Sequence, residues 1–222
     1  MNDSSHAAQP RLTIRHVLAD TYRAVLALDS PVLRVMRELT LRPGTFVRRY
    51  VEGERAGVVG PVKYALFAVT LLVIVGQAHR AFFDPEPVPG FDEARLEAFY
   101  AAQDLRTYLL LLVLVPTALV QRALFARWRF NVAETYAFLA YVFGHFVWLW
   151  ITVSILPASI RELPLVDRLF TLLSVAYILW AVCDFYRSRS LSVIVRGLAV
   201  YATFAALMTA SLQMVIIWRT GM

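Results

Sequence analysis

Five long apolar stretches dominate the pattern of hydrophobic and polar positions along the chain. A helix needs roughly 20 mainly apolar residues to cross about 30 Å of hydrocarbon, because its backbone hydrogen bonds must close internally. Each of the five stretches meets that requirement. We therefore predict transmembrane helices at residues 61–82, 106–126, 133–156, 164–186 and 193–218.

Prolines and one tryptophan support these boundaries. Pro61 and Pro164 stand where the first turn of a helix accepts proline. Pro116 falls at mid-depth in the second stretch and predicts a kink there. Trp218 closes the fifth stretch, where an aromatic ring suits the membrane interface. The predicted fold class is all-α, a polytopic membrane helical bundle with five transmembrane helices.

The first 60 residues show a different pattern, in which short apolar faces recur at helical spacing. Residues 12–28 form one such amphipathic segment. A second helix is expected after Ser30 and Pro31, with Pro43-Gly44 as its stop, and a third short helix follows. The predicted organisation has three parts, listed in chain order: a disordered N-terminus at 1–10, cytoplasmic interfacial amphipathic helices, two or three in number, at 11–60, and the five-helix transmembrane domain at 61–222.

Composition agrees with a membrane protein. Hydrophobic residues make up 59% of the 222 residues and charged residues 17%, which is unlike an ordinary soluble domain. The net charge of +6 comes from arginines that adjoin apolar runs, so anionic lipid is favoured as the counter-charge and nucleic acid is not. The single Cys183 excludes an internal disulfide and a multi-cysteine metal site.

Charge asymmetry predicts the orientation. With the N-terminus inside, the inner segments hold 16 Lys and Arg, and the outer segments hold 6. Basic loops stay cytoplasmic, so we expect the N-terminus in the cytoplasm and the C-terminus outside. The first ten residues have no basic region followed by an apolar core, and no cleaved signal peptide is expected.

Basic residues crowd just before the first apolar stretch, at Arg48, Arg49, Arg55 and Lys63. At the inner headgroups, each such charge attracts anionic lipid by about 1 kcal/mol. These four residues are the candidate contacts to lipid headgroups or to a protein partner. The apolar faces of this segment could instead pack under the bundle as ordinary core, and the sequence favours neither alternative.

Polar residues inside the apolar stretches form two groups. Glu134, Tyr141 and His145 lie along one face of the third stretch, as a proton relay or a metal ligand would, although a hydrogen-bonded structural histidine is the favoured interpretation. Glu134, Asp184 and Arg196 lie near inner helix ends, where one or more ion pairs could join the helices. Arg196 could alternatively bind a lipid phosphate.

The sequence contains none of the common soluble-enzyme motifs, such as GxSxG, GxxxxGK, GxGxxG or CxxC. We therefore predict no catalytic residue, no cofactor and no metal. The favoured function is a non-enzymatic membrane module that binds lipid or a partner. A small transporter or channel subunit with a polar face at Glu134, Tyr141 and His145 is the alternative, and an intramembrane enzyme is third. A homo-oligomer or a membrane-protein partner stays open.

Several blocks of the sequence resemble a known family. "RLTIRHVLAD", "LTLRPGTFVRRYVEGER" followed by "GPVKYALF", "FNVAETYAFLAYVFGHF" and "FYRSRSLSVIVRGLAVY" look like successive blocks of domain of unknown function 3667, an uncharacterised bacterial inner-membrane family. The most specific positions are Pro43, Gly44, Tyr50, Gly53, Arg55, Pro61 and Tyr64. Members often begin with a cysteine-pair zinc ribbon, which this sequence lacks. The resemblance implies a polytopic helical bundle in the inner (cytoplasmic) membrane, and no particular activity.

Overall fold

The computed structural model describes residues 31–83, 93–156, 160 and 163–220. The predicted disordered N-terminus and the amphipathic segment at residues 12–28 lie outside them. The described residues form helices and no strands, in agreement with the all-α prediction. In chain order the elements are α2 (Pro31–Leu41), α3 (Pro43–Val51), α4 (Pro61–Phe83), α5 (Glu93–Leu124), the 3-10 helix η1 (Ala126–Trp128), α6 (Val132–Ser154), α8 (Pro164–Phe185) and α9 (Leu191–Thr220).

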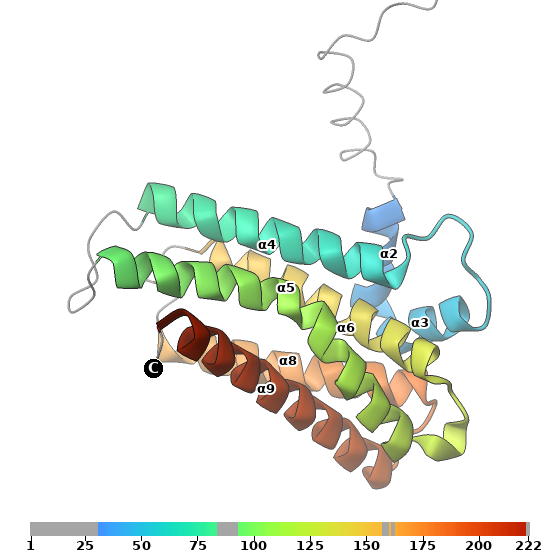
Figure 1. The fold of residues 1–222 in the computed structure, drawn as a ribbon. Helices are drawn as coiled ribbons and strands as arrows, with labels where there is room; N and C mark the ends of the chain where they lie inside the picture. Colours follow the sequence, from blue (N-terminus) through green and yellow to red (C-terminus); the bar gives the residue numbers. More distant parts are fainter. Residues whose placement is uncertain (1–30, 84–92, 157–159, 161–162, 221–222) are drawn as a thin grey trace, which may run out of the picture.

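Four of these helices are long and apolar enough to cross a membrane: Pro61–His79, Val132–Ser154, Pro164–Phe185 and Leu191–Ser211. The chain is therefore a multi-pass membrane protein by helix length and composition. α5 contributes a shorter apolar stretch, Leu111–Leu124, so the predicted count of five spans is not confirmed. α5 contains Pro116 in its interior, and Figure 1 shows it changing direction along its length.

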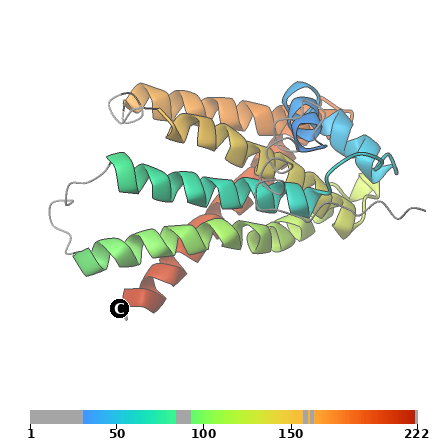
Figure 2. The ribbon, with the colours of Figure 1, turned by 90° about the horizontal axis from the view of Figure 1, so that it is seen from above.

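Most of the long helices run back and forth along roughly one direction, and α9 crosses them obliquely (Figures 1 and 2). α4 and α6 are parallel neighbours: the Tyr64 hydroxyl lies 2.9 Å from His145 Nδ1, and the Phe67 and Trp148 rings follow at 5.8 Å. α5 returns the chain between α4 and α6, and it packs against both. α9 then lies against α5 and α8. The ends of α4 and α9 are therefore at one end of the bundle, and the start of α6 is at the other.

α6 is the central helix. Most of its residues from Thr135 to Val147 are buried, whereas α4, α8 and α9 keep one apolar face outside. Gly144 lets α4 approach closely, because a Cβ there would lie 2.9 Å from the Ala65 Cα. Large exposed side chains such as Leu172 and Leu173 on α8 are suited to contact with lipid.

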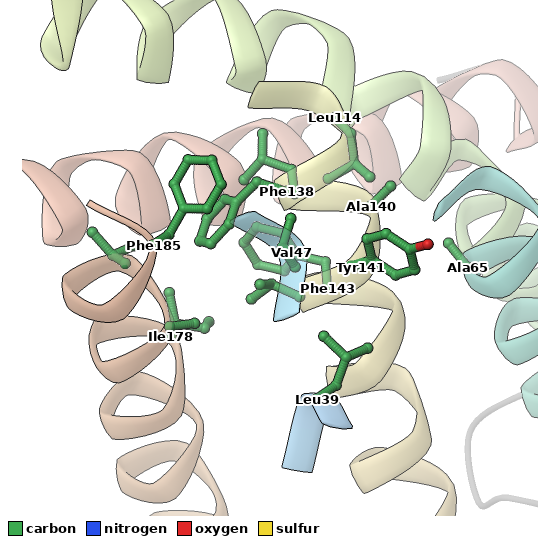
Figure 3. Packing of buried hydrophobic residues seen from close by; sticks show 14 of the residues in the cluster. Leu39, Val47, Ala65, Leu114, Phe138, Ala140, Tyr141, Phe143, Ile178 and Phe185 are labelled. Atoms are coloured by element: carbon green, nitrogen blue, oxygen red, sulfur yellow. The ribbon is translucent and has the colours of Figure 1, made fainter. Parts of the chain in front are cut away.

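α2 and α3 are packed on the bundle. α2 lies across the direction of the long helices in both views (Figures 1 and 2). Val35, Leu39, Phe46 and Val47 are buried in the same cluster as α6 and α8, and Figure 3 shows Leu39 and Val47 beside Tyr141 and Phe143. Of the two alternatives for these amphipathic faces, the structure supports core packing.

Candidate functional site

One end of the bundle brings together the loops that are far apart in the sequence. We call it the basic end: α3, the loop at residues 52–60, the end of α5 with η1, and the turn at residues 186–190. The Trp128 indole N–H donates a hydrogen bond to the Tyr186 carbonyl at 3.0 Å, and the Phe125 and Tyr186 rings stack at 4.0 Å. Burial raises the pKa of the Tyr186 phenol, although a hydrogen bond from Gln121 lowers it, so the phenol is neutral at physiological pH.

The exposed charges of the described residues are concentrated at this end. Glu52 and Glu54 are its exposed acids. At the opposite end, the described exposed charges are Asp167 and Arg168, one of each sign. The exposed cations of the basic end, of α2 and Arg42 beside it, and of the start of α4 are Arg34, Arg37, Arg42, Arg55, Lys63, Arg122, Arg127, Arg129, Arg187 and Arg189.

α3 and α8 cap one another at the basic end. The backbone N–H and the hydroxyl of Thr45, in the first turn of α3, both donate to the Asp184 carboxylate, the hydroxyl at 2.9 Å. In return, an Arg48 guanidinium N–H donates to the Phe185 carbonyl at 2.9 Å. Helix N-termini have free N–H groups and a partial positive charge, and C-termini have free carbonyls. Each helix therefore supplies a hydrogen-bond partner to backbone groups at the end of the other helix.

Gly44 makes this α3–α8 junction possible. A Cβ at Gly44 would meet backbone atoms of Ala181, Asp184 and Phe185, so the two helix ends touch backbone to backbone. The sequence interpretation of Pro43-Gly44 as a helix stop needs correction. The break falls at Arg42, and both Pro43 and Gly44 belong to the first turn of α3. The proline suits the helix start because its missing N–H would have had no partner there.

The four basic candidates before the first apolar stretch have different roles. Arg48 is held by Glu52 at 2.8 Å as well as by α8, and its guanidinium lies over the Phe130 ring. Arg49 pairs with Glu38 at 2.6 Å, and Glu54 is further away at 3.9 Å. Arg55 donates to the Tyr50 carbonyl and lies over the Tyr50 ring. Lys63 is exposed on α4. Arg48 and Arg49 thus stabilise the fold, and Arg55 and Lys63 keep their charges toward the surface.

The ion pair expected among Glu134, Asp184 and Arg196 is absent from the ion pairs of the described residues. Glu134 forms a capping box with Asn131, in which each side chain accepts the other's backbone N–H at 2.8 and 2.9 Å. Asp184 is bound to Thr45. Arg196 is half-buried on α9. The physical reason is that helix N-termini supply hydrogen-bond donors to both carboxylates without a cation.

His145 is the centre of a hydrogen-bonded chain between α4, α6 and α2. It is 2% exposed, with Tyr64 on Nδ1 at 2.9 Å and Thr40 on Nε2 at 3.2 Å. The Thr40 hydroxyl donates to the Met36 carbonyl, so it accepts from Nε2–H, and Nδ1 accepts from Tyr64. Tyr141, one helical turn away, donates to the Val59 carbonyl. Two of the three side chains of the predicted polar face, Tyr141 and His145, therefore hold neighbouring segments against α6.

No group of three or more His, Cys, Asp or Glu side chains that could hold a metal occurs among the residues that the structure describes. A groove of about 310 Å³ does lie at the basic end, between α2, α3 and the following loop. Sequence reasoning missed three of its charged residues, Glu54 in the loop and Arg34 and Glu38 on α2. The i, i+4 spacing of Arg34 and Glu38 was the available signal, since it puts both on one face. The groove is lined by Arg34, Glu38, Phe46, Arg49, Gly53, Glu54, Arg55, Ala56 and Val58.

Comparison with protein families gives a match over the N-terminal part of the described chain. Residues 29–73 match the family model described as "Protein of unknown function (DUF3667)". The match confirms the resemblance in this segment, which contains α2, α3, the loop, the first half of α4 and every residue that lines the groove. The searches of curated proteins and of solved structures returned no match to the chain.

Proposed function

We propose that the protein is a non-enzymatic module of a bacterial inner membrane, and that its basic end binds the anionic lipid surface on the cytoplasmic side. The observation that carries this proposal is the gathering of exposed cations around one end of an apolar bundle. Each basic group near an anionic leaflet is worth about 1 kcal/mol, so ten exposed cations at and beside one end of the bundle give a strong attraction. The capped α3–α8 junction fixes part of this face relative to the long helices.

Five membrane crossings fit this proposal better than four. α4 and α6 run in the same direction, so the chain must return between them, and α5 is the helix that does so. If α4 and α6 both cross the membrane, α5 crosses it as well. An odd number of crossings puts the basic end and the end of α9 on opposite sides of the membrane. The distribution of Lys and Arg then favours the basic end inside and the end of α9 outside.

The hydrogen-bond partners of the polar residues on α6 support a structural role for these residues and not a catalytic or transport role. His145 has hydrogen-bond partners on both ring nitrogens, and the Tyr141 hydroxyl is bound to the backbone before α4. Glu134 is occupied as a helix cap. These residues hold helices together, as a structural histidine and its neighbours would, and they supply no argument for the transporter alternative.

The test uses the full chain in a neutral detergent, with anionic phosphatidylglycerol or zwitterionic phosphatidylcholine added. We expect phosphatidylglycerol to raise the unfolding temperature more, because it binds the folded basic end, and we expect salt to reduce the difference. A variant with Arg37, Arg42, Arg122 and Arg189 changed to glutamine should lose much of the effect. Equal stabilisation by both lipids at low salt would overturn the proposal and favour a protein partner for the basic end.

A further inference from the structure

We propose that the groove between α2, α3 and the loop at residues 52–60 is a binding site for one phosphodiester group, held by Arg34 and Arg55. This deepens the proposed function and rests on the membrane placement made there. The proposed function requires only diffuse attraction between many cations and an anionic surface. The groove would instead give one saturable site with a defined stoichiometry.

Some of the charged residues that line the groove form ion pairs with one another, and others do not. Glu38 and Glu54 both lie against Arg49, at 2.6 and 3.9 Å. Arg34 and Arg55 form no ion pair in the described part of the chain, which leaves two cations of the lining without a counter-charge. The five charged lining residues sum to a single positive charge. That sum matches the single negative charge of a phosphodiester, and it suits a phosphomonoester dianion less well.

Hydrogen-bond donors are also available. Arg34 and Arg55 are exposed, so their guanidinium groups can reach a ligand in the groove. Guanidinium groups present paired N–H donors whose geometry fits phosphate oxygens. Phe46, Ala56 and Val58 provide an apolar part of the lining for the non-polar atoms next to a phosphate.

The loop is shaped to admit Arg34 into this site. Gly53 and Gly57 have φ angles of +116° and +65°, in the region that favours glycine. A Cβ on Gly57 would lie 3.3 Å from an Arg34 guanidinium nitrogen, so the side chain of α2 reaches the loop where a glycine leaves space. The loop leads directly into Pro61, the first residue of α4, which places the groove beside the membrane boundary, where lipid phosphates lie.

The test is native mass spectrometry of the full chain in detergent, titrated with phosphatidylglycerol. We expect one saturable lipid adduct. The double variant Arg34→Gln with Arg55→Gln should weaken it by at least about tenfold, since each lost charged hydrogen bond contributes. The matched control is Arg37→Gln with Arg42→Gln, which removes the same charge from exposed arginines outside the groove and should retain the adduct.

Gly57→Ala is a second variant that keeps every charge and moves Arg34. It should also weaken the adduct. If both double variants weaken lipid binding equally, the groove proposal is wrong and the diffuse attraction of the proposed function survives. If no lipid binds the wild type in preference to phosphatidylcholine, both proposals fail.

Soluble probes identify the source of the phosphate and its charge state. Glycerophosphoglycerol carries the same diester without acyl chains, and its binding with the same dependence on Arg34 and Arg55 would assign the site to soluble diesters as well as lipids. Binding of phosphatidylglycerol alone would assign it to lipid. Equal or tighter binding of glycerol 3-phosphate, a monoester, would contradict the choice of a diester.

Discussion

The α3–α8 junction and the neighbouring groove use the same residue type in opposite ways. In the junction, the Arg48 side chain is 20% exposed and is bound to Glu52 and to the end of α8. In the groove, Arg34 and Arg55 are exposed and form no ion pair within the described residues. A basic segment before a membrane helix therefore contains two kinds of arginine, one that fixes the fold and one that faces outward. The following predictions test that division, from the largest expected effect to the smallest.

Gly44→Ala should cause the largest loss of stability. The added methyl would overlap backbone atoms of α8, which cannot move aside as a side chain can, so we expect a loss of about 3 kcal/mol or more. Gly60→Ala is the matched control, because its Cβ would meet only the Tyr50 hydroxyl at 3.6 Å. Thermal unfolding of both variants in detergent measures the difference. Equal unfolding temperatures would show that α3 does not lie against α8 as described.

Asp184→Ala should cost about 1 to 3 kcal/mol, because it leaves a helix N-terminus without its cap and two donors without an acceptor. A double-mutant cycle with Thr45→Ala isolates the side-chain part of this interaction. We expect the two changes to be less than additive, since either one removes the bond between the Thr45 hydroxyl and the carboxylate. Full additivity would contradict the contact.

Glu134→Ala and Arg196→Ala test whether Glu134 acts as a helix cap, as observed, or forms the ion pair with Arg196 that the sequence suggested. Glu134→Ala should cost about 1 kcal/mol through loss of the capping box, and Arg196→Ala should cost less. The two effects should add, because the residues share no contact in the structure. A coupling free energy well above about 0.5 kcal/mol between them would restore the ion pair that the sequence suggested.

The groove variant should have the smallest effect on stability. Arg34→Gln with Arg55→Gln should change the free energy of unfolding by no more than about 0.5 kcal/mol in lipid-free detergent, because both side chains are exposed. Arg48→Gln should cost more, about 1 to 2 kcal/mol, since it breaks a charged hydrogen bond to a helix end. A larger loss of stability in the groove double variant than in Arg48→Gln would contradict the division into arginines that fix the fold and arginines that face outward.

Much of the fold could be predicted from the sequence, because hydrophobic length and helical spacing are local properties. The starts of α4 and α8 at Pro61 and Pro164 were marked by proline. α5 begins at Glu93, ahead of the predicted transmembrane helix at residues 106–126, and its apolar stretch is short because its first half is polar. Local patterns also suggested the helices at α2 and α3, although Pro43 and Gly44 were placed outside α3.

The candidate site was less predictable, because its contacts join residues far apart in the sequence. Asp184 binds Thr45, 139 positions away, and no local pattern indicates that pairing. Charge complementarity suggested a cation as the partner of each carboxylate, but helix N-termini competed successfully for both Glu134 and Asp184. The groove depends on the fold of α2 against the loop, so Arg34 gave no stronger signal than any exposed arginine.

The most direct test of the central claim, that the basic end faces the cytoplasm, is labelling of single cysteines in intact cells. In a Cys183→Ser background, Ser190→Cys reports the basic end and Asp167→Cys reports the opposite end, since both positions are exposed. A membrane-impermeant maleimide should label Asp167→Cys in intact cells and Ser190→Cys only after permeabilisation. Labelling of Ser190→Cys in intact cells, with Asp167→Cys protected, would contradict the orientation and the proposed contact with the inner leaflet.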